Sequence, residues 1–229
     1  MIAKAFKRLL KSFFLRIPSS SILMFHHVGV TESERISSCN LSKDVFESIC
    51  KNFSNISRSV DDVLIHNGYV AFTFDDGFED FYYNAFPILQ QYRIPFVLFV
   101  VEDFIGEKGY LSKSQLKTIL DSSLCEIGSH GKTHKILSKL TAEELVDEIV
   151  QSRINIESLL GCKINKMAYS HGNADARCLN MVQVYDTAYC AHSMPLNFIT
   201  RLSKYKYPRL NMTDKTYAEH VRFVKKYIE

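Results

Sequence analysis

The stretch Val-Ala-Phe-Thr-Phe-Asp-Asp-Gly at residues 70–77 joins an apolar strand to two adjacent carboxylates. The run before Asp75 and Asp76 has high strand propensity, and Gly77 permits a tight turn after them. Two carboxylates at the end of a buried strand are costly unless a cation compensates their charge. An Asp-Asp-Gly turn on the surface is the simpler alternative.

On both sides of this stretch, short apolar runs alternate with longer amphipathic patterns. The short runs predict strands, with a turn closing the fifth, at residues 21–28, 69–76, 95–101, 125–130, 166–172 and 187–192. Helical spacing predicts helices at residues 43–53, 60–68, 78–93, 141–161 and 213–229. Strand–helix alternation predicts an α/β fold with a parallel sheet, and this number of units suits a barrel, complete or incomplete.

Several helix ends carry recognisable signals. Thr141 and Glu144 form a capping box at the start of the helix over 141–161, and Gly161 ends it. Thr213 is placed to open the last helix, and Pro87 is expected to bend the helix over 78–93.

Length and composition indicate a single globular domain. The chain has 229 residues, of which 46% are hydrophobic, so a sizeable core is expected. The net charge of +3, without a Lys/Arg stripe, argues against nucleic acid as a partner. The six cysteines are scattered and form no CxxC pair, which favours reduced packing thiols over disulfides.

The first residues form a segment of different character. Residues 1–18 are basic, and their apolar residues recur at helical spacing. Charges interrupt the apolar run, so neither a cleaved signal peptide nor a membrane span is expected. We therefore divide the chain into this segment and one catalytic domain over residues 19–229. A cytoplasmic location is therefore expected. We expect residues 1–17 to be either a helix that contacts the inner face of the membrane or a helix that docks on the domain itself; both alternatives stay open.

Polar residues end several of the predicted strands. Asp75 and Asp76 follow one strand, and His130 and His171 follow two others. In parallel α/β folds the carboxyl ends of the strands share one edge, where sites gather. These side chains are therefore expected to lie close together.

His130 and His134 are four residues apart in Ser-His-Gly-Lys-Thr-His. If this segment is helical, both imidazoles lie on one face. Two histidines and one carboxylate are a common ligand set for Zn²⁺ or another divalent transition metal. The pair alone is weak evidence, but together with Asp75 and Asp76 it favours a metal site.

The two stretches, Thr-Phe-Asp-Asp-Gly at 73–77 and Ser-His-Gly-Lys-Thr-His at 129–134, resemble the first motifs of the polysaccharide deacetylase family. This family is also known as the NodB-homology domain and carbohydrate esterase family 4. The resemblance covers roughly residues 21–210. It implies a distorted, incomplete (β/α) barrel of the NodB-homology type, a divalent metal and hydrolysis of an acyl group on a sugar.

The resemblance also implies a role for each matching residue. Asp75 matches the general base, while Asp76, His130 and His134 match the metal ligands. The metal is usually Zn²⁺, although Co²⁺, Ni²⁺ or Mn²⁺ suit the same ligands. A metal lowers the pKa of bound water toward about 7, and a neighbouring carboxylate can accept the proton.

The third motif departs from the family pattern. Residues 168–172 read Ala-Tyr-Ser-His-Gly, and the resemblance puts Tyr169 at the position whose backbone N–H stabilises the oxyanion. Ser170 and His171 replace the usual proline and aromatic residue, and we expect them to contact the substrate. The arginine that holds the base is missing from this motif. Arg209, in Pro-Arg-Leu at 208–210, resembles an arginine that does this work in some relatives.

The proton donor for the leaving amine has no clear match. The family's last motif, Leu-x-His, is not found. Three candidates stay open, in the order His26, His171 and His192. His26 leads because Met-Phe-His-His-Val at 24–28 resembles a segment whose first histidine faces the site in some relatives.

These features predict a metal-dependent carbohydrate deacetylase that removes an N-acyl group, most simply acetyl, from an amino sugar in a polysaccharide or glycan precursor. A second hypothesis is a deacetylase or deformylase of a lipid-linked or nucleotide-linked sugar at the cytoplasmic membrane face. A third is a degenerate family member that binds carbohydrate without hydrolysing it. Release of acetate or formate from acylated amino sugars discriminates the third hypothesis from the others.

Overall fold

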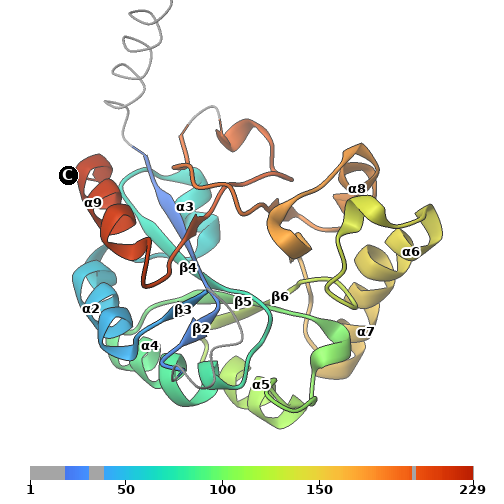
Figure 1. Ribbon diagram of the computed structural model, residues 1–229, viewed down its shortest axis with the longest axis horizontal. Helices are drawn as coiled ribbons and strands as arrows, with labels where there is room; N and C mark the ends of the chain where they lie inside the picture. Colours follow the sequence, from blue (N-terminus) through green and yellow to red (C-terminus); the bar gives the residue numbers. More distant parts are fainter. Residues whose placement is uncertain (1–18, 31–38, 198–199, 229) are drawn as a thin grey trace, which may run out of the picture.

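The fold is built around one curved parallel sheet (Figure 1). The computed structural model describes residues 19–30, 39–197 and 200–228. Within these ranges the sheet has seven strands in the order β8-β7-β6-β5-β4-β1-β9. They are β1 (Ser21–Phe25), β4 (Val70–Phe74), β5 (Phe96–Val100), β6 (Cys125–Ser129), β7 (Lys166–Ala168), β8 (Thr187–Tyr189) and β9 (Leu210–Asn211). All neighbouring pairs run parallel, which confirms the prediction of an incomplete (β/α) barrel.

Helices surround the sheet (Figure 1). They are α2 (Lys43–Phe53), α3 (Val60–Ile65), α4 (Phe86–Tyr92), α5 (Lys113–Leu120), α6 (Ala142–Val146), α7 (Ser152–Leu160), α8 (Ala176–Met181) and α9 (Tyr217–Ile228). π-helical turns η3 (Phe81–Ala85) and η6 (Asp147–Gln151) precede α4 and join α6 to α7. A small sheet pairs β2 (His27–Val28) with β3 (Asn40–Leu41). Single 3₁₀ turns are η2 (Ser54–Ile56), η4 (Glu102–Phe104), η5 (Leu137–Lys139), η7 (Ser170–Gly172), η8 (Val182–Val184) and η9 (Thr200–Leu202).

The helix signals in the sequence are confirmed in part. Thr141 and Glu144 form the predicted capping box, and Gly161 ends α7 in the left-handed conformation. Pro87 lies in the first turn of α4, where no N–H is needed, directly after the π-helical turn. The expectation that Thr213 opens the last helix is wrong. A local turn between Thr213 and Thr216 delays the start of α9 to Tyr217.

The core has two parts on opposite faces of the sheet. On β4, Val70, Phe72 and Phe74 pack toward the helices, while Ala71 belongs to the cluster inside the barrel. Because side chains alternate along a strand, the inward row continues through Thr73 to Asp75. The side chain of Asp75 therefore points into the barrel at the carboxyl end of β4.

The open side of the barrel is bridged by the chain that leads into β9. Cys190 donates its backbone N–H to Tyr207 O at 2.8 Å, and Tyr207 donates to Ala188 O at 3.0 Å. This segment crosses from β8 toward β1 and places Arg209 inside the barrel, where it is fully buried.

Residues 1–18 lie outside the described ranges, so the division at residue 18 stays a prediction. Across the described ranges, no helix is long and apolar enough to cross a membrane. The six cysteines all lie in the described ranges, and no disulfide joins any of them.

Candidate active site

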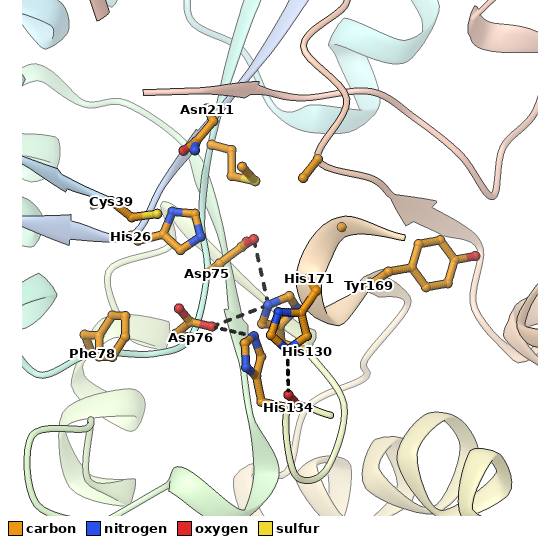
Figure 2. Close-up of a pocket in the computed structure, with 13 residues that line it drawn as sticks. His26, Cys39, Asp75, Asp76, Phe78, His130, His134, Tyr169, His171 and Asn211 are labelled. Atoms are coloured by element: carbon orange, nitrogen blue, oxygen red, sulfur yellow. Dashed lines mark hydrogen bonds and ion pairs between the residues drawn. The ribbon is translucent and has the colours of Figure 1, made fainter. Parts of the chain in front are cut away.

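A cavity of about 380 Å³ opens at the carboxyl ends of the strands (Figure 2). This catalytic pocket collects side chains from segments far apart in sequence. Its lining consists of Met24, His26, Cys39, Asp75, Asp76, Phe78, His130, His134, Tyr169, His171, Gly172, Ala191 and Asn211. Four of the residues singled out from sequence, Asp75, Asp76, His130 and His134, therefore meet in one place.

Asp75 is held by a two-pronged ion pair. Arg209 donates Nη1–H to Asp75 Oδ1 at 2.6 Å and Nη2–H to Oδ2 at 2.7 Å. Arg209 also donates to Thr73 Oγ1 at 3.2 Å and to Cys190 O at 3.3 Å. The guanidinium thus has partners from β4 and from the chain after β8, which fixes the plane of the carboxylate.

The charge state of Asp75 follows from two opposing effects. Burial raises the pKa of this carboxyl, but the Arg209 guanidinium and His130 outweigh burial and bring the pKa to about 2. Asp75 is therefore an ionised carboxylate at neutral pH, and Arg209, inside the barrel, sets its orientation.

Asp76, His130 and His134 form a three-residue cluster beside Asp75. Asp76 Oδ1 lies 3.4 Å from His130 Nε2 and 3.2 Å from His134 Nε2. One ligand atom from each residue lies within 4.8 Å of the other two. Asp76 has φ 71°, a left-handed conformation that is unusual for a residue other than glycine. This turn directs Asp76 away from the inward row of β4 and toward the two imidazoles.

The tautomer of His130 is set by the backbone. His130 donates its Nδ1–H to Ala168 O at 2.8 Å, so the neutral ring presents a lone pair at Nε2. Gly128, two residues earlier on β6, has no room for a side chain because a Cβ there would lie 2.4 Å from the Phe99 ring. Close packing of β6 on the barrel interior thereby brings His130 to the pocket.

The segment between the two histidines is not helical, so the helical interpretation of their spacing is wrong. Gly131 has φ 87° and His134 has φ 57°, and both values break a right-handed helix. The carboxylate of Glu148 instead organises the loop, accepting the backbone N–H of Lys132 at 2.8 Å and that of Thr133 at 3.1 Å. A Cβ on Gly131 would approach Glu148 Oε2 to 2.8 Å.

The cluster fits a divalent cation on its own chemistry. Asp76 Oδ1 is buried and has no hydrogen-bond donor among the described residues. Burial lowers the pKa of both His130 and His134, which keeps their imidazoles neutral. Neutral ring nitrogens do not neutralise the negative charge of the carboxylate that faces them, so burying this charge costs free energy. A cation bound by all three residues removes that cost. The backbone-anchored Nδ1–H of His130 is typical of metal-binding histidines.

The structure contradicts two expectations for the third motif. Tyr169 cannot offer its backbone N–H to a substrate, because that group donates to Tyr189 O at 3.1 Å in line with the β7–β8 pairing. Ser170 is buried and donates its hydroxyl to His130 O at 2.8 Å. It therefore supports the loop of residues 130–134, which we call the histidine loop, and does not line the pocket.

The three candidate proton donors occupy different places. His26 lies between β1 and β2 and lines the pocket, with its Nδ1 buried and without a hydrogen-bond partner in the described structure. His171 also lines the pocket, and its Nε2–H donates to His134 O at 3.2 Å. His192 is exposed and outside the lining. Figure 2 shows His26 and His171 on opposite sides of the Asp75–Asp76 pair.

Several residues that line or support the pocket were not predicted from the sequence. Phe78 directly follows the Asp-Asp-Gly turn, and this position is the one sequence signal that could have identified it. Cys39 and Asn211 come from β3 and β9 regions whose short strands have no clear pattern. Glu148 looks like an ordinary acidic residue of an amphipathic helix, although its carboxylate is buried.

Comparisons with known proteins agree with the fold and the motifs. A sequence model of the polysaccharide deacetylase family matches residues 65–190. The Bacillus subtilis protein YxkH is 27% identical over 114 residues, which cover 50% of this chain and 40% of YxkH. Poly-β-1,6-N-acetyl-D-glucosamine N-deacetylase of Staphylococcus aureus is 34% identical over 82 residues, which cover 34% of this chain and 28% of that enzyme. The chain thus spans less than half the length of these relatives. The crystal structure of a Bacillus cereus polysaccharide deacetylase shares the fold, with a TM-score of 0.81 at 22% identity over 91% of this chain and 69% of that one.

Proposed function

Because this chain belongs to the polysaccharide deacetylase family, we propose that it hydrolyses the N-acetyl group of an amino sugar in a polysaccharide or glycan precursor, with a divalent metal. The observation that carries this proposal is the geometry around Asp75. A carboxylate held by Arg209 lies beside a three-residue cluster suited to a cation, in one cavity.

The metal would be held by Asp76, His130 and His134, with Zn²⁺ as the first choice for this ligand set. A divalent ion there supplies Lewis acidity, which lowers the pKa of water at the site and stabilises negative charge on the carbonyl oxygen. Co²⁺, Ni²⁺ and Mn²⁺ suit the same ligands.

Asp75 is the proposed general base. Its carboxylate accepts a proton from the attacking water, while Arg209 keeps the carboxylate ionised and oriented. Water adds to the amide carbonyl, and the carbon–nitrogen bond then breaks to give acetate and the free amine.

His26 is the proposed proton donor to the leaving amine. It lines the pocket across from the histidine loop, and its Nδ1 has no partner among the described residues. Burial lowers the pKa of His26, and the opposing effect of the Asp75 and Asp76 carboxylates offsets this only in part. His171 lies against the histidine loop, and we assign it to the wall that the sugar contacts.

Acetate release tests the proposal. The zinc-loaded chain should release acetate from β-1,6-linked N-acetylglucosamine oligomers, and chelator treatment should abolish this release. His26→Asn should slow release at least about 100-fold while the zinc content stays unchanged. No acetate from any acylated amino-sugar oligomer, with zinc bound, would refute the hydrolase proposal.

A further inference from the structure

The described chain enters the fold at the amino end of β1, whereas the catalytic pocket opens at the carboxyl ends of the strands. Ser19 O accepts the backbone N–H of Gly68 at 3.1 Å, and Ser20 donates its hydroxyl to His66 O at 2.8 Å. Ser20 also exchanges two backbone hydrogen bonds with Leu196, at 3.0 and 2.8 Å. The start of the described chain is therefore fixed between the end of α3 and the segment that leads to Leu196.

Two large apolar side chains are exposed beside this junction. Ile65, the last residue of α3, is 73% exposed and directly precedes His66. Met194 is 49% exposed and lies two positions before Leu196. Each of them is thus one or two residues away from a group that holds Ser20. A segment that covered both side chains would be stabilised by removing their apolar area from water.

The exposed face of α3 also carries negative charge. Asp61 and Asp62 precede Ile65 by four and three positions, so these exposed side chains lie on one side of the helix. Asp61 pairs with Lys166, but a second carboxylate shares that lysine, so the charge of Asp61 is only partly neutralised. Arg201 donates to two backbone carbonyls at the end of α3, where its charge is opposed by the helix dipole. We define the entry surface by Asp61, Asp62, Ile65 and Met194.

Residues 1–18 have the complementary character in their sequence. Their apolar residues recur at helical spacing, and five lysines and arginines lie among them. Phe13 and Phe14 lie six and five positions before Ser19. Five residues of chain span at most about 18 Å, which is enough to reach a surface that begins one residue from the contacts of Ser20. The segment can therefore bring apolar and cationic side chains to the entry surface together.

The size and charge of the entry surface favour a tethered segment over a separate partner. Two exposed apolar side chains offer far less than the roughly 1,000 Å² that a stable interface between separate molecules needs. A tethered segment meets the surface at an effective concentration on the order of mM, so a small contact suffices. The anionic headgroups of a membrane would be repelled by Asp61 and Asp62, whereas lysine and arginine side chains are attracted.

We propose that residues 1–18 dock on the entry surface of their own chain, with apolar side chains against Ile65 and Met194 and cationic side chains near Asp61 and Asp62. The inference does not depend on the proposed function. Docking at the amino end of the strands leaves the catalytic pocket open to its substrate.

Hydrogen–deuterium exchange in the full chain, without lipid, tests the inference. Isolated helices of this length are marginal in water, so slow exchange within residues 1–18 requires contacts outside the segment. We expect the amides of residues 6–14 to exchange at least about tenfold more slowly in the parent than in the double variant Ile65→Ser/Met194→Ser. The control is Ile154→Ser/Val184→Ser, which changes side chains that are 50% and 40% exposed on α7 and η8. It should keep the parental exchange.

A crosslink identifies the docked segment and its chain. Ile65→benzoylphenylalanine is irradiated, and the products are separated by mass before digestion. We expect a product of monomer mass in which position 65 is joined to a peptide from residues 1–18. The same photoreactive residue at position 154 should give no such peptide.

Three results would overturn the inference. The first is exchange in residues 6–14 that is fast in the parent, and the second is exchange that is the same in the parent and in Ile65→Ser/Met194→Ser. The third is a crosslink to residues 1–18 found only at dimer mass, which would assign the entry surface to a second copy. If exchange is fast, sedimentation of the chain with phosphatidylglycerol vesicles but not with phosphatidylcholine vesicles would assign the segment to a membrane instead.

Discussion

Arg209 and Asp75 form a bidentate ion pair inside the barrel, across 134 positions of sequence, with N–O distances of 2.6 and 2.7 Å. Both side chains are almost completely buried. A buried pair of this kind orients the carboxylate, but each partner depends on the other because neither charge has access to water.

Loss of Arg209 should therefore reduce stability strongly. Arg209→Met leaves the Asp75 carboxylate buried and unpaired, and we expect a loss of about 3–5 kcal/mol in the free energy of unfolding. Urea denaturation measures the change. Arg222→Met, at an exposed arginine of α9, should stay within about 0.5 kcal/mol of the parent. Adding Asp75→Asn to Arg209→Met should recover part of the loss, and equal stability of the two single arginine variants would contradict the account.

Metal binding should depend on the three-residue cluster. His134→Ala removes one of the three converging ligands, so zinc affinity should fall by at least about 100-fold. Competition with a chromogenic chelator measures the affinity. His192→Ala, at an exposed histidine outside the pocket, is the matched control and should bind zinc like the parent. Unchanged zinc affinity in His134→Ala would rule out this ligand set.

The loop that carries His134 should tolerate no side chain at Gly131. Gly131→Ala adds a left-handed strain of about 1–2 kcal/mol and pushes on Glu148, which holds the loop. Gly161→Ala carries a similar φ of 73° but has open space around the new Cβ, so it isolates the strain. We expect both variants to lose stability in thermal melts, and Gly131→Ala alone to lose zinc affinity. Equal zinc affinity in the two variants would show that Glu148 does not position the loop.

Stability in acid should depend on Asp175, the N-cap of α8. The hydrogen bond from Arg177 and the backbone N–H of Cys178 lower the pKa of Asp175 to about 2. A lowered pKa means that the stabilisation is complete above the unfolded value of 3.8 and is lost as pH falls through about 2. Asp175→Ala should cost about 1 kcal/mol at pH 6, and the cost should shrink toward pH 2. A pH-independent difference in urea melts would contradict this assignment.

The sequence was most informative where local pattern and motif coincide. Apolar strands, the capping box at Thr141 and the residues Asp75, Asp76, His130 and His134 follow from patterns within a few residues. The role of Arg209 beside Asp75 was suggested by resemblance alone, since its position depends on the segment that bridges β8 and β9.

The errors have a common physical origin in contacts between distant segments. Tyr169 has its backbone N–H committed to Tyr189 on the next strand, and Ser170 turns its hydroxyl to His130. The loop geometry of His134 depends on Glu148, which is 14 positions away in a helix. Sequence spacing does not reveal such partners.

The most direct test of the central claim is acetate release by the zinc-loaded Asp75→Asn variant, measured together with its zinc content. One zinc per chain would show that the pocket has formed without the carboxylate. With zinc bound, we expect release at least about 100-fold slower than the parent chain, because the group that accepts the water proton is gone. Release at the parental rate would contradict the assignment of Asp75 as the base, and with it the proposed mechanism.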